Sequence, residues 1–224
     1  LSDPSVAARL VTTRPDVIYH LAAIVSGEAE ADFDKGYRIN LDGMRFLLEA
    51  IRQEGMREPS KPRLVFTSSI AVYGRNQVPM TEEATPQPED PYGIAKYAVE
   101  LDLREAHEMF GLNHVIFRPH NVYGENQNIG DRYRNVIGIF MNQVMQGQPM
   151  TIFGDGSQTR AFSHIDDVAP VIAASIARPA AYNQTFNVGA DQPYTVSELA
   201  QTVARAMQVQ PAIKHLEARN EVVN

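Results

Sequence analysis

Short runs of β-branched and aromatic residues alternate along this chain with longer stretches whose apolar residues recur every three or four positions. The short runs have the composition of buried strands, and the longer stretches have the period of amphipathic helices. Alternating strands and helices predict a parallel sheet with helices on both faces. The expected fold is α/β, a doubly wound parallel sheet. Its strands are expected at DVIYHLAA (16–23), RLVFTSS (63–69), HVIFRP (114–119), MTIF (150–153) and TFNVG (185–189).

The helical period is clearest in residues 40–55, which Gly55 is expected to end, and in residues 91–111, which end at Gly111. The opening stretch reads as a helix that feeds a strand already deep in the sheet. Three further helices are expected at 136–146, 165–177 and 195–208. The last of them begins with Thr195 and has Glu198 three residues later, which is the pattern of a capping box.

Composition narrows the class of partner. The 224 residues are 44% hydrophobic and carry a formal net charge of −7, which argues against nucleic acid and anionic membranes as main partners. The longest apolar run, at 168–177, is too short to span a bilayer. There is no cysteine, so no disulfide or thiolate metal site is expected, and no metal is predicted. The N-terminus has no signal-peptide pattern, and a cytoplasmic location is expected.

Candidate functional residues are expected just after the strands, because ligands bind beyond the carboxyl ends of the strands in such sheets. The segments HLAAIVSG, TSSIAVYG and RPHNVYG each turn small or polar at that point.

Tyr92 and Lys96 stand four residues apart at the start of the 91–111 helix, so they share one face of it. A tyrosine titrates near ~10, and lowering this pKa to about 7 takes roughly 4 kcal/mol. A lysine ammonium about 4 Å away could supply that much at an effective dielectric constant of ~20. The spacing therefore suits a phenolate general base, although the same spacing is also common on solvent-exposed helix faces.

Ser69 ends the strand 63–69, and its hydroxyl could hydrogen-bond the substrate hydroxyl that Tyr92 deprotonates. The alternative is that Thr67, Ser68 and Ser69 only satisfy backbone groups in the turn.

Six ordered segments resemble a known family: YHLAA, INLDGMRFLLEA, VFTSSIAVYG, PYGIAK, FRPHNVYG and TIFGDGSQTRAFSHIDDVA. They are similar to the NAD-dependent epimerase/dehydratase family of extended short-chain dehydrogenases/reductases, and most of all to the nucleotide-sugar epimerases, the group of UDP-glucose 4-epimerase. The resemblance covers nearly the whole chain. It implies a Rossmann-like fold and NAD as the cofactor.

The resemblance also implies roles for particular residues. Ser69, Tyr92 and Lys96 match the catalytic triad of the family. The substrate-binding positions are Ser69, Asn121, Arg160 and Arg219, of which the two arginines match residues that bind the nucleotide diphosphate. The cofactor-binding positions, in addition to Tyr92 and Lys96, are Ala22, Ala23, Asn40, Thr67, Ser68 and Pro119.

The family's Gly-rich phosphate-binding turn does not occur in this chain, so the sequence is expected to be truncated at its N-terminus. We expect residues 1–120 to be a partial dinucleotide-binding domain with the catalytic residues. Residues 121–224 are expected to complete the sheet and to form the small substrate-binding region.

Several functions remain open. The preferred hypothesis is epimerisation of a nucleotide-sugar through transient oxidation. A dehydratase is disfavoured, because Ile70 and Ala71 stand where that subgroup places an Asp-Glu pair. One alternative is an NAD-dependent dehydrogenase of a small sugar acid, since VSGEAEADFDKGYRINLDG resembles erythronate-oxidising relatives. A non-catalytic nucleotide-binding protein is the other. The resemblance also implies a homodimer.

Overall fold

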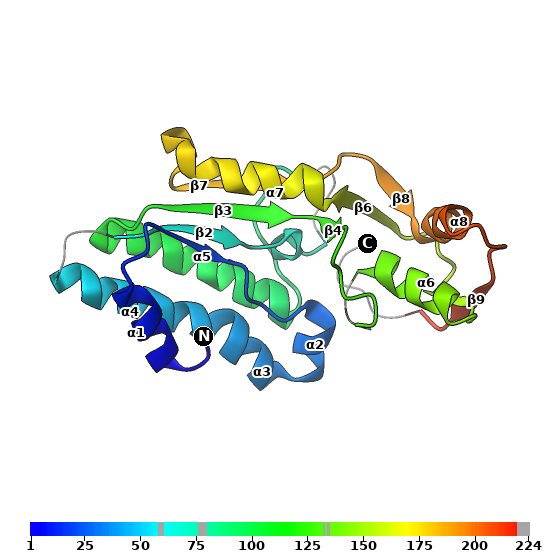
Figure 1. Ribbon diagram of the computed structural model, residues 1–224, viewed down its shortest axis with the longest axis horizontal. Helices are drawn as coiled ribbons and strands as arrows, with labels where there is room; N and C mark the ends of the chain where they lie inside the picture. Colours follow the sequence, from blue (N-terminus) through cyan, green and yellow to red (C-terminus); the bar gives the residue numbers. More distant parts are fainter. Residues whose placement is uncertain (58–60, 76–79, 132, 134, 219–224) are drawn as a thin grey trace. The chain divides into compact units, whose positions relative to one another are not determined.

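The computed structural model describes residues 1–57, 61–75, 80–131, 133 and 135–218 (Figure 1). The chain forms two compact units. Unit 1 contains Leu1–Pro119 and Pro170–Val188, and unit 2 contains His120–Ala169 and Gly189–Asn224. The assignment of a cofactor domain and a substrate domain stays a prediction.

Unit 1 is built on a parallel sheet, as the sequence predicts. The strand order is β1-β2-β3-β7, and each neighbouring pair runs parallel. Among the described residues β1 pairs with β2 alone, so the expectation that the first strand lies deep in the sheet stays a prediction. The four strands are β1 (Val17–His20), β2 (Arg63–Thr67), β3 (His114–Pro119) and β7 (Gln184–Val188).

Helices cover both faces of this sheet (Figure 1). On one face, Leu64 and Phe66 pack with Leu47 and Leu103 in a core supplied by α1 (Pro4–Thr12), α4 (Gly43–Arg57) and α5 (Pro91–Phe110). On the other face, Val65, Val115 and Phe117 pack against side chains that include Ile172 and Ile176 from α7 (Ile165–Ala174), η3 (Ser175–Ala177) and their surroundings. A short 3-10 turn, η4 (Pro179–Ala181), precedes β7. The doubly wound fold is confirmed.

With one exception, the predicted helix ends lie within two residues of the observed ends. Gly55 does not end α4, which runs on to Arg57, because a single glycine costs a helix only about 1 kcal/mol and Ile51 and its neighbours are already packed. The stretch 165–177 is α7 followed by the separate 3-10 turn η3. Gly111 does end α5, in the left-handed conformation with φ 72°.

Four short helical segments follow the ends of β1 and β2, and only residues 40–42 of them belong to a predicted helix. These segments are too short for apolar residues to recur at helical spacing, so hydrophobic periodicity does not predict them. One of them contains the buried Asn40 in a π-helix, a distortion that is frequent at functional sites. They are α2 (Ser26–Ala31), α3 (Phe33–Tyr37), η1 (Arg38–Asp42) and η2 (Ile70–Tyr73).

Unit 2 has its own core, in which Phe140, Met150, Ile152, Leu199 and Val203 pack together. Two small sheets frame it, of order β4-β6-β8 and β5-β9. The capping box of Thr195 and Glu198 is present at the start of α8, as predicted. The elements are β4 (Asn121–Tyr123), α6 (Val136–Met145), β5 (Met150–Phe153), β6 (Thr159–His164), β8 (Pro193–Thr195), α8 (Val196–Ala206) and β9 (Ile213–Leu216).

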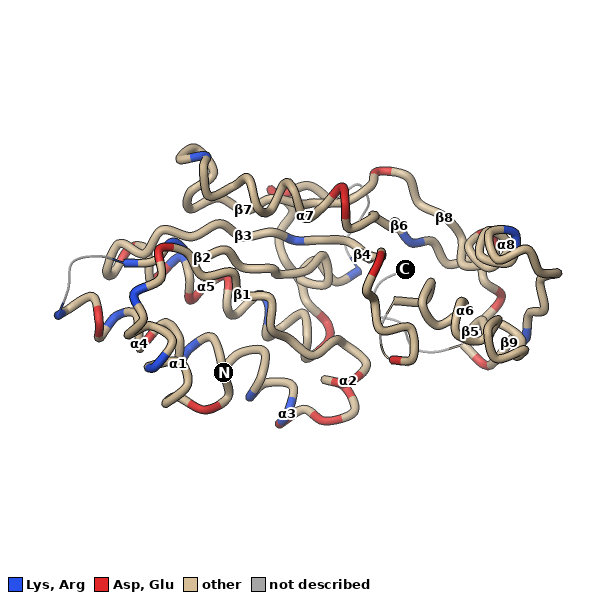
Figure 2. The backbone as a smooth tube through the Cα atoms, viewed as in Figure 1, with Lys and Arg blue, Asp and Glu red and all other residues tan. Residues whose placement is uncertain are grey.

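Basic and acidic residues are interspersed along α4 rather than forming a basic stripe (Figure 2). In this helix, Arg52 pairs with Glu49 at 2.7 Å and Arg57 with Glu54 at 3.8 Å. Such exposed pairs contribute little to stability. Within the described part of the chain, no helix is both long and apolar enough to cross a membrane.

Candidate active site

The first turn of α5 places Tyr92 beside the turn that carries Ser69. Asp90 caps the helix, and its Oδ1 accepts a hydrogen bond of 2.6 Å from the Gly93 amide. A Cβ atom on Gly93 would lie 2.6 Å from the carbonyl oxygen of Ala71, so only glycine allows this approach. The helix start and the turn after β2 are therefore in direct contact.

Ser69 lies in extended conformation between β2 and η2. Its Oγ accepts a hydrogen bond of 3.2 Å from the Ala71 amide and so caps the 3-10 turn. The side chain is half-buried, and its hydroxyl hydrogen is not needed for this bond. Ser69 can therefore serve both expected roles: its oxygen caps the turn, and its hydroxyl hydrogen can still be donated to a substrate.

Lys96 is buried beneath Tyr92. Its Nζ donates a hydrogen bond of 2.7 Å to the carbonyl oxygen of Thr67, the last residue of β2. The same nitrogen lies 4.8 Å from the centroid of the Phe66 ring and 5.7 Å from that of the Tyr92 ring. The structure therefore brings Tyr92 and Lys96 together against the end of β2, two residues before Ser69.

Burial changes the electrostatics expected of this lysine. Loss of solvent lowers the pKa of Lys96 from 10.5 to about 7, and the charge of Glu100 opposes the decrease. The spacing of Tyr92 and Lys96 predicts an ammonium group beside the phenol, but the charge of Lys96 at neutral pH depends on its buried neighbours.

The tail of β1 is held by two of the predicted cofactor residues. Thr67 Oγ1 donates a hydrogen bond of 3.2 Å to the His20 carbonyl oxygen. Asn40 uses its whole amide on Ile24, accepting from the backbone nitrogen and donating to the carbonyl oxygen at 2.9 Å each. Ala22 is exposed and Ala23 half-buried on this tail. The small residues thus lie on a backbone segment whose position is fixed.

Ser68 and Pro119 complete the set in unit 1. The Ser68 side chain is buried, and its Oγ donates a hydrogen bond of 2.5 Å to Glu100 Oε1. Pro119 ends β3 and is half-buried. Ser68 therefore faces the interior with its hydroxyl, not solvent.

The predicted substrate residues belong to unit 2. Asn121 begins β4 and donates a hydrogen bond of 3.1 Å from Nδ2 to the Ala161 carbonyl oxygen on β6. Arg160 lies on the same strand β6, half-buried, and its Nη1 donates to the Thr159 carbonyl oxygen at 2.7 Å. Asn121 and Arg160 thus come from paired strands. Arg219 lies outside the described residues.

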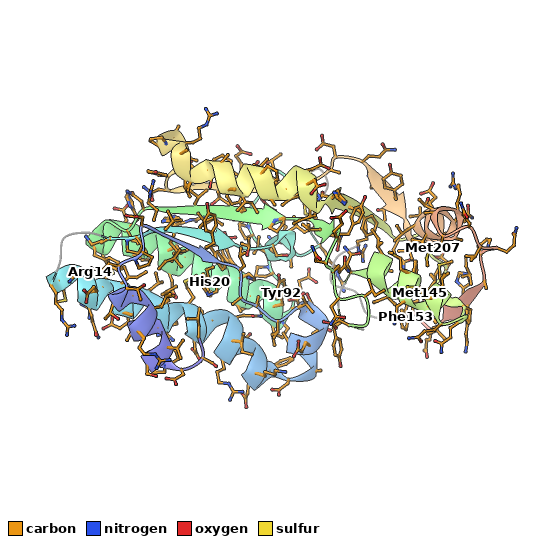
Figure 3. All side chains as sticks on the ribbon, in the orientation of Figure 1. Arg14, His20, Tyr92, Met145, Phe153 and Met207 are labelled. Carbon is orange, nitrogen blue, oxygen red and sulfur yellow. The ribbon has the colours of Figure 1, made fainter. Side chains whose placement is uncertain are left out.

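Sequence reasoning missed His20, which ends β1 and is 3% exposed (Figure 3). Neither of its ring nitrogens has a hydrogen-bond partner in the described residues. Burial lowers the pKa of His20 to about 4, and the charge of Lys96 acts in the same direction. A buried imidazole without a partner requires explanation, such as a bound polar group. A histidine at a strand end was the available signal.

A family profile matches residues 1–189, the NAD dependent epimerase/dehydratase family. The chain belongs to this family. UDP-glucose 4-epimerase of Mycolicibacterium smegmatis is 33% identical over 210 residues, which are 92% of this chain and 64% of that protein. D-erythronate dehydrogenase of Cupriavidus necator is 46% identical over 106 residues, 47% of this chain and 32% of that protein.

The fold comparison agrees with this epimerase/dehydratase membership. The structure of UDP-glucose 4-epimerase from Thermotoga maritima with UDP-glucose has a TM-score of 0.88 and 28% identity, covering 99% of this chain and 71% of the other. The chain matches less than two thirds of the length of the Mycolicibacterium smegmatis epimerase and of the Cupriavidus necator dehydrogenase.

The family is NAD-dependent, and the residues of unit 1 fit a dinucleotide at the carboxyl edge of the sheet. Lys96 donates one hydrogen bond among the described residues, although an ammonium has three donors. Ala22 and Ala23, with their small side chains, follow β1, which ends at His20. Within the described residues, the ring nitrogens of His20 have no hydrogen-bond partner. We find no group of three or more His, Asp or Glu residues able to hold a metal in the part of the chain that the structure describes.

Proposed function

We propose that this chain carries the catalytic residues of an NAD-dependent epimerase that inverts a hydroxyl-bearing carbon of a nucleotide-sugar. The observation that carries the proposal is the placement of Tyr92 over Lys96, with both held against the end of β2 that leads to Ser69. The likeness to UDP-glucose 4-epimerases over 92% or more of the chain supports the substrate class.

The roles follow from the chemistry of each group. Tyr92, as the general base, takes the proton of the sugar hydroxyl, and Ser69 donates a hydrogen bond to the oxygen as negative charge develops on it. Lys96 supplies the adjacent positive charge that favours the phenolate. After the keto-sugar has rotated in the site to present its other face, Tyr92 returns the proton to the same oxygen.

When bound, NAD would accept the hydride from the sugar carbon and return it. We propose that Lys96 holds the nicotinamide ribose with its remaining N–H donors. Ala22 and Ala23 allow the cofactor to approach the tail of β1. Asn40 and Thr67 act by fixing that tail, and Pro119 lines the end of β3.

Substrate binding is assigned to unit 2. Asn121, Arg160 and Arg219 are proposed to hold the nucleotide diphosphate, because a guanidinium donates to phosphate in a bidentate manner. These contacts anchor the nucleotide while the keto-sugar rotates.

A second candidate is a dehydrogenase that oxidises a small sugar acid and releases NADH. It is favoured by the 46% identity to D-erythronate dehydrogenase over 106 residues. The triad of Ser69, Tyr92 and Lys96 serves this reaction equally well. A non-catalytic nucleotide-binding protein has less support, because the chain retains both Tyr92 and Lys96. Tyr92 is half-buried, Lys96 is buried, and the Lys96 ammonium lies against the Tyr92 ring.

One screen separates these functions. The natural protein containing this chain is incubated with NAD and panels of nucleotide-sugars and C4–C6 sugar acids, while NADH absorbance and product stereochemistry are followed together. The epimerase proposal predicts an inverted nucleotide-sugar without net NADH. Stoichiometric NADH with a sugar acid would establish the dehydrogenase, and no turnover in either panel would support the binding protein.

Quaternary structure and location are part of the proposal. We propose a cytoplasmic homodimer, and the exposed apolar side chains of Ile94 and Leu101 on α5 are consistent with a contact surface. Light scattering at micromolar concentration tests the dimer, and a monomer mass would reject it.

A further inference from the structure

A buried polar cluster underlies the active-site residues of unit 1. We call Ser68, Tyr73, Glu100, Arg118 and Asn187 the Glu100 cluster. We propose that Glu100 and Arg118 are positioning residues for the Tyr92–Lys96 pair: the cluster fixes α5 against the ends of β2 and β3, and its carboxylate holds a negative charge one helical turn from Lys96.

The geometry of the cluster is closely constrained. Arg118 donates from Nε to Glu100 Oε1 at 2.9 Å and from Nη2 to Oε2 at 2.6 Å. Its third nitrogen, Nη1, donates to the Tyr73 hydroxyl at 2.7 Å, and that hydroxyl donates to Asn187 Oδ1 at 2.8 Å. Ser68 Oγ donates to Glu100 Oε1 at 2.5 Å. A planar fork with three bonded nitrogens permits little rotation.

Each principal member is adjacent to a residue of the proposed site. Ser68 directly precedes Ser69, and Arg118 directly precedes Pro119. Glu100 follows Lys96 by four residues and Tyr92 by eight, which places the three side chains along one face of α5. The cluster therefore sets the distance between the helix that carries the base and the strand end that carries Ser69.

Stability alone does not account for this arrangement. Glu100 is 0% exposed and Arg118 is 1% exposed, and a buried ion pair contributes no more stability on average than well-packed apolar side chains. The charge has a different consequence here. Burial lowers the pKa of Lys96, and the Glu100 carboxylate is the charge that opposes this effect.

The electrostatic part of the proposal rests on groups that all face Lys96. The titratable groups that face Lys96 are Glu100 from the same helix, the proposed base Tyr92, and His20 from β1, which remains neutral because burial lowers its pKa to about 4. The Thr67 carbonyl oxygen and the face of Phe66 add only a dipole and π electrons. Before Tyr92 ionises, Glu100 is thus the anion that favours the charged form of Lys96.

The proposal rests on the proposed function only for its kinetic consequence, so its main test does not use substrate. Protein with 13C-labelled lysine ε-carbons is titrated by NMR, and the Lys96 signal is assigned by its loss in Lys96→Met. In Glu100→Gln we expect the Lys96 midpoint to fall by about one pH unit below that of the wild type. Glu105→Gln, an exposed substitution on the same helix, leaves the midpoint unchanged.

The kinetic consequence is measured on the substrate found by the screen. In Glu100→Gln the rise of kcat/KM with pH is displaced relative to wild type, whereas a purely structural role lowers the melting temperature and leaves the pH profile in place. An unchanged Lys96 midpoint in a folded Glu100→Gln protein overturns the proposal, whether or not a substrate has been found.

Ser68→Ala provides the test if Glu100→Gln fails to fold. It removes one hydrogen bond of the cluster and keeps both charges. We expect kcat to fall about tenfold with KM little changed, and the crystal structure to show a shifted Ser69 turn. Wild-type kcat together with an unmoved Ser69 turn would contradict the positioning role.

Discussion

Lys96 and Thr67 join the helix and the strand on which the proposed chemistry depends. The Lys96 Nζ donates to the Thr67 carbonyl oxygen at 2.7 Å, and Lys96 is 2% exposed. This bond holds one turn of α5 at the end of β2, so that Tyr92, four residues before Lys96, and Ser69, two residues after Thr67, enter the same neighbourhood.

Gly93 is expected to be intolerant of a side chain. In Gly93→Ala the new Cβ meets the Ala71 carbonyl oxygen at 2.6 Å, so α5 must move away from the Ser69 turn. We expect kcat to fall and the free energy of unfolding to decrease by about 1–3 kcal/mol. The matched control is Gly55→Ala in α4, where the nearest atom is the flexible end of Lys61 and a gain of up to about 1 kcal/mol is expected. Equal effects of the two substitutions in urea denaturation would argue against the close contact.

Lys96→Met is expected to abolish turnover and yet stabilise the protein at pH 6. The folded state releases the Lys96 proton near pH 7 and the unfolded chain near 10.5, a difference of roughly 5 kcal/mol. The lysine therefore destabilises the fold fully below pH 7, and the penalty disappears as pH rises to about 10.5. Urea denaturation should show a larger advantage of the variant at pH 6 than at pH 10. An advantage that does not change with pH would refute the lowered pKa.

The sequence was sufficient for the strands that form the sheet and for the spacing of Tyr92 and Lys96, because both depend on local periodicity. It did not predict the partners of Glu100. That contact joins Glu100 to Arg118, 18 residues away, and only the packing of α5 on β3 brings the two together. Of the strands in the small sheets of unit 2, β5 was predicted, whereas β4, β6, β8 and β9 were not. β4 and β8 have three residues each and no measurable period.

Two buried histidines are expected to make the fold sensitive to acid. Burial lowers the pKa of His20 and His114 to about 4, against 6.5 in the unfolded chain. Their contribution to stability is complete above pH 6.5 and is lost as the pH falls through that value towards 4, because the unfolded state binds the protons first. His20→Phe or His114→Phe should flatten the decline of the unfolding free energy over this range. His215→Phe, at an exposed position, serves as the control and should follow the wild-type curve.

Arg160 is expected to contribute to binding rather than to chemistry. In Arg160→Lys the bidentate fork is lost while the charge remains, so KM for the nucleotide-sugar should rise about tenfold or more with kcat nearly unchanged. Arg205→Lys in α8, which is exposed, should leave both constants unchanged. A decrease in kcat alone in Arg160→Lys would not fit a role in anchoring the nucleotide.

The turnover of Tyr92→Phe, in the natural protein with NAD and the substrate found by the screen, tests the central claim most directly. Removing one hydroxyl group while keeping the ring should lower kcat by about 10²–10⁴-fold. Circular dichroism, melting temperature and NAD binding should stay close to those of the wild type, and Tyr97→Phe on the same helix should remain active. Turnover of Tyr92→Phe at a rate near that of the wild type would contradict the assignment of Tyr92 as the base.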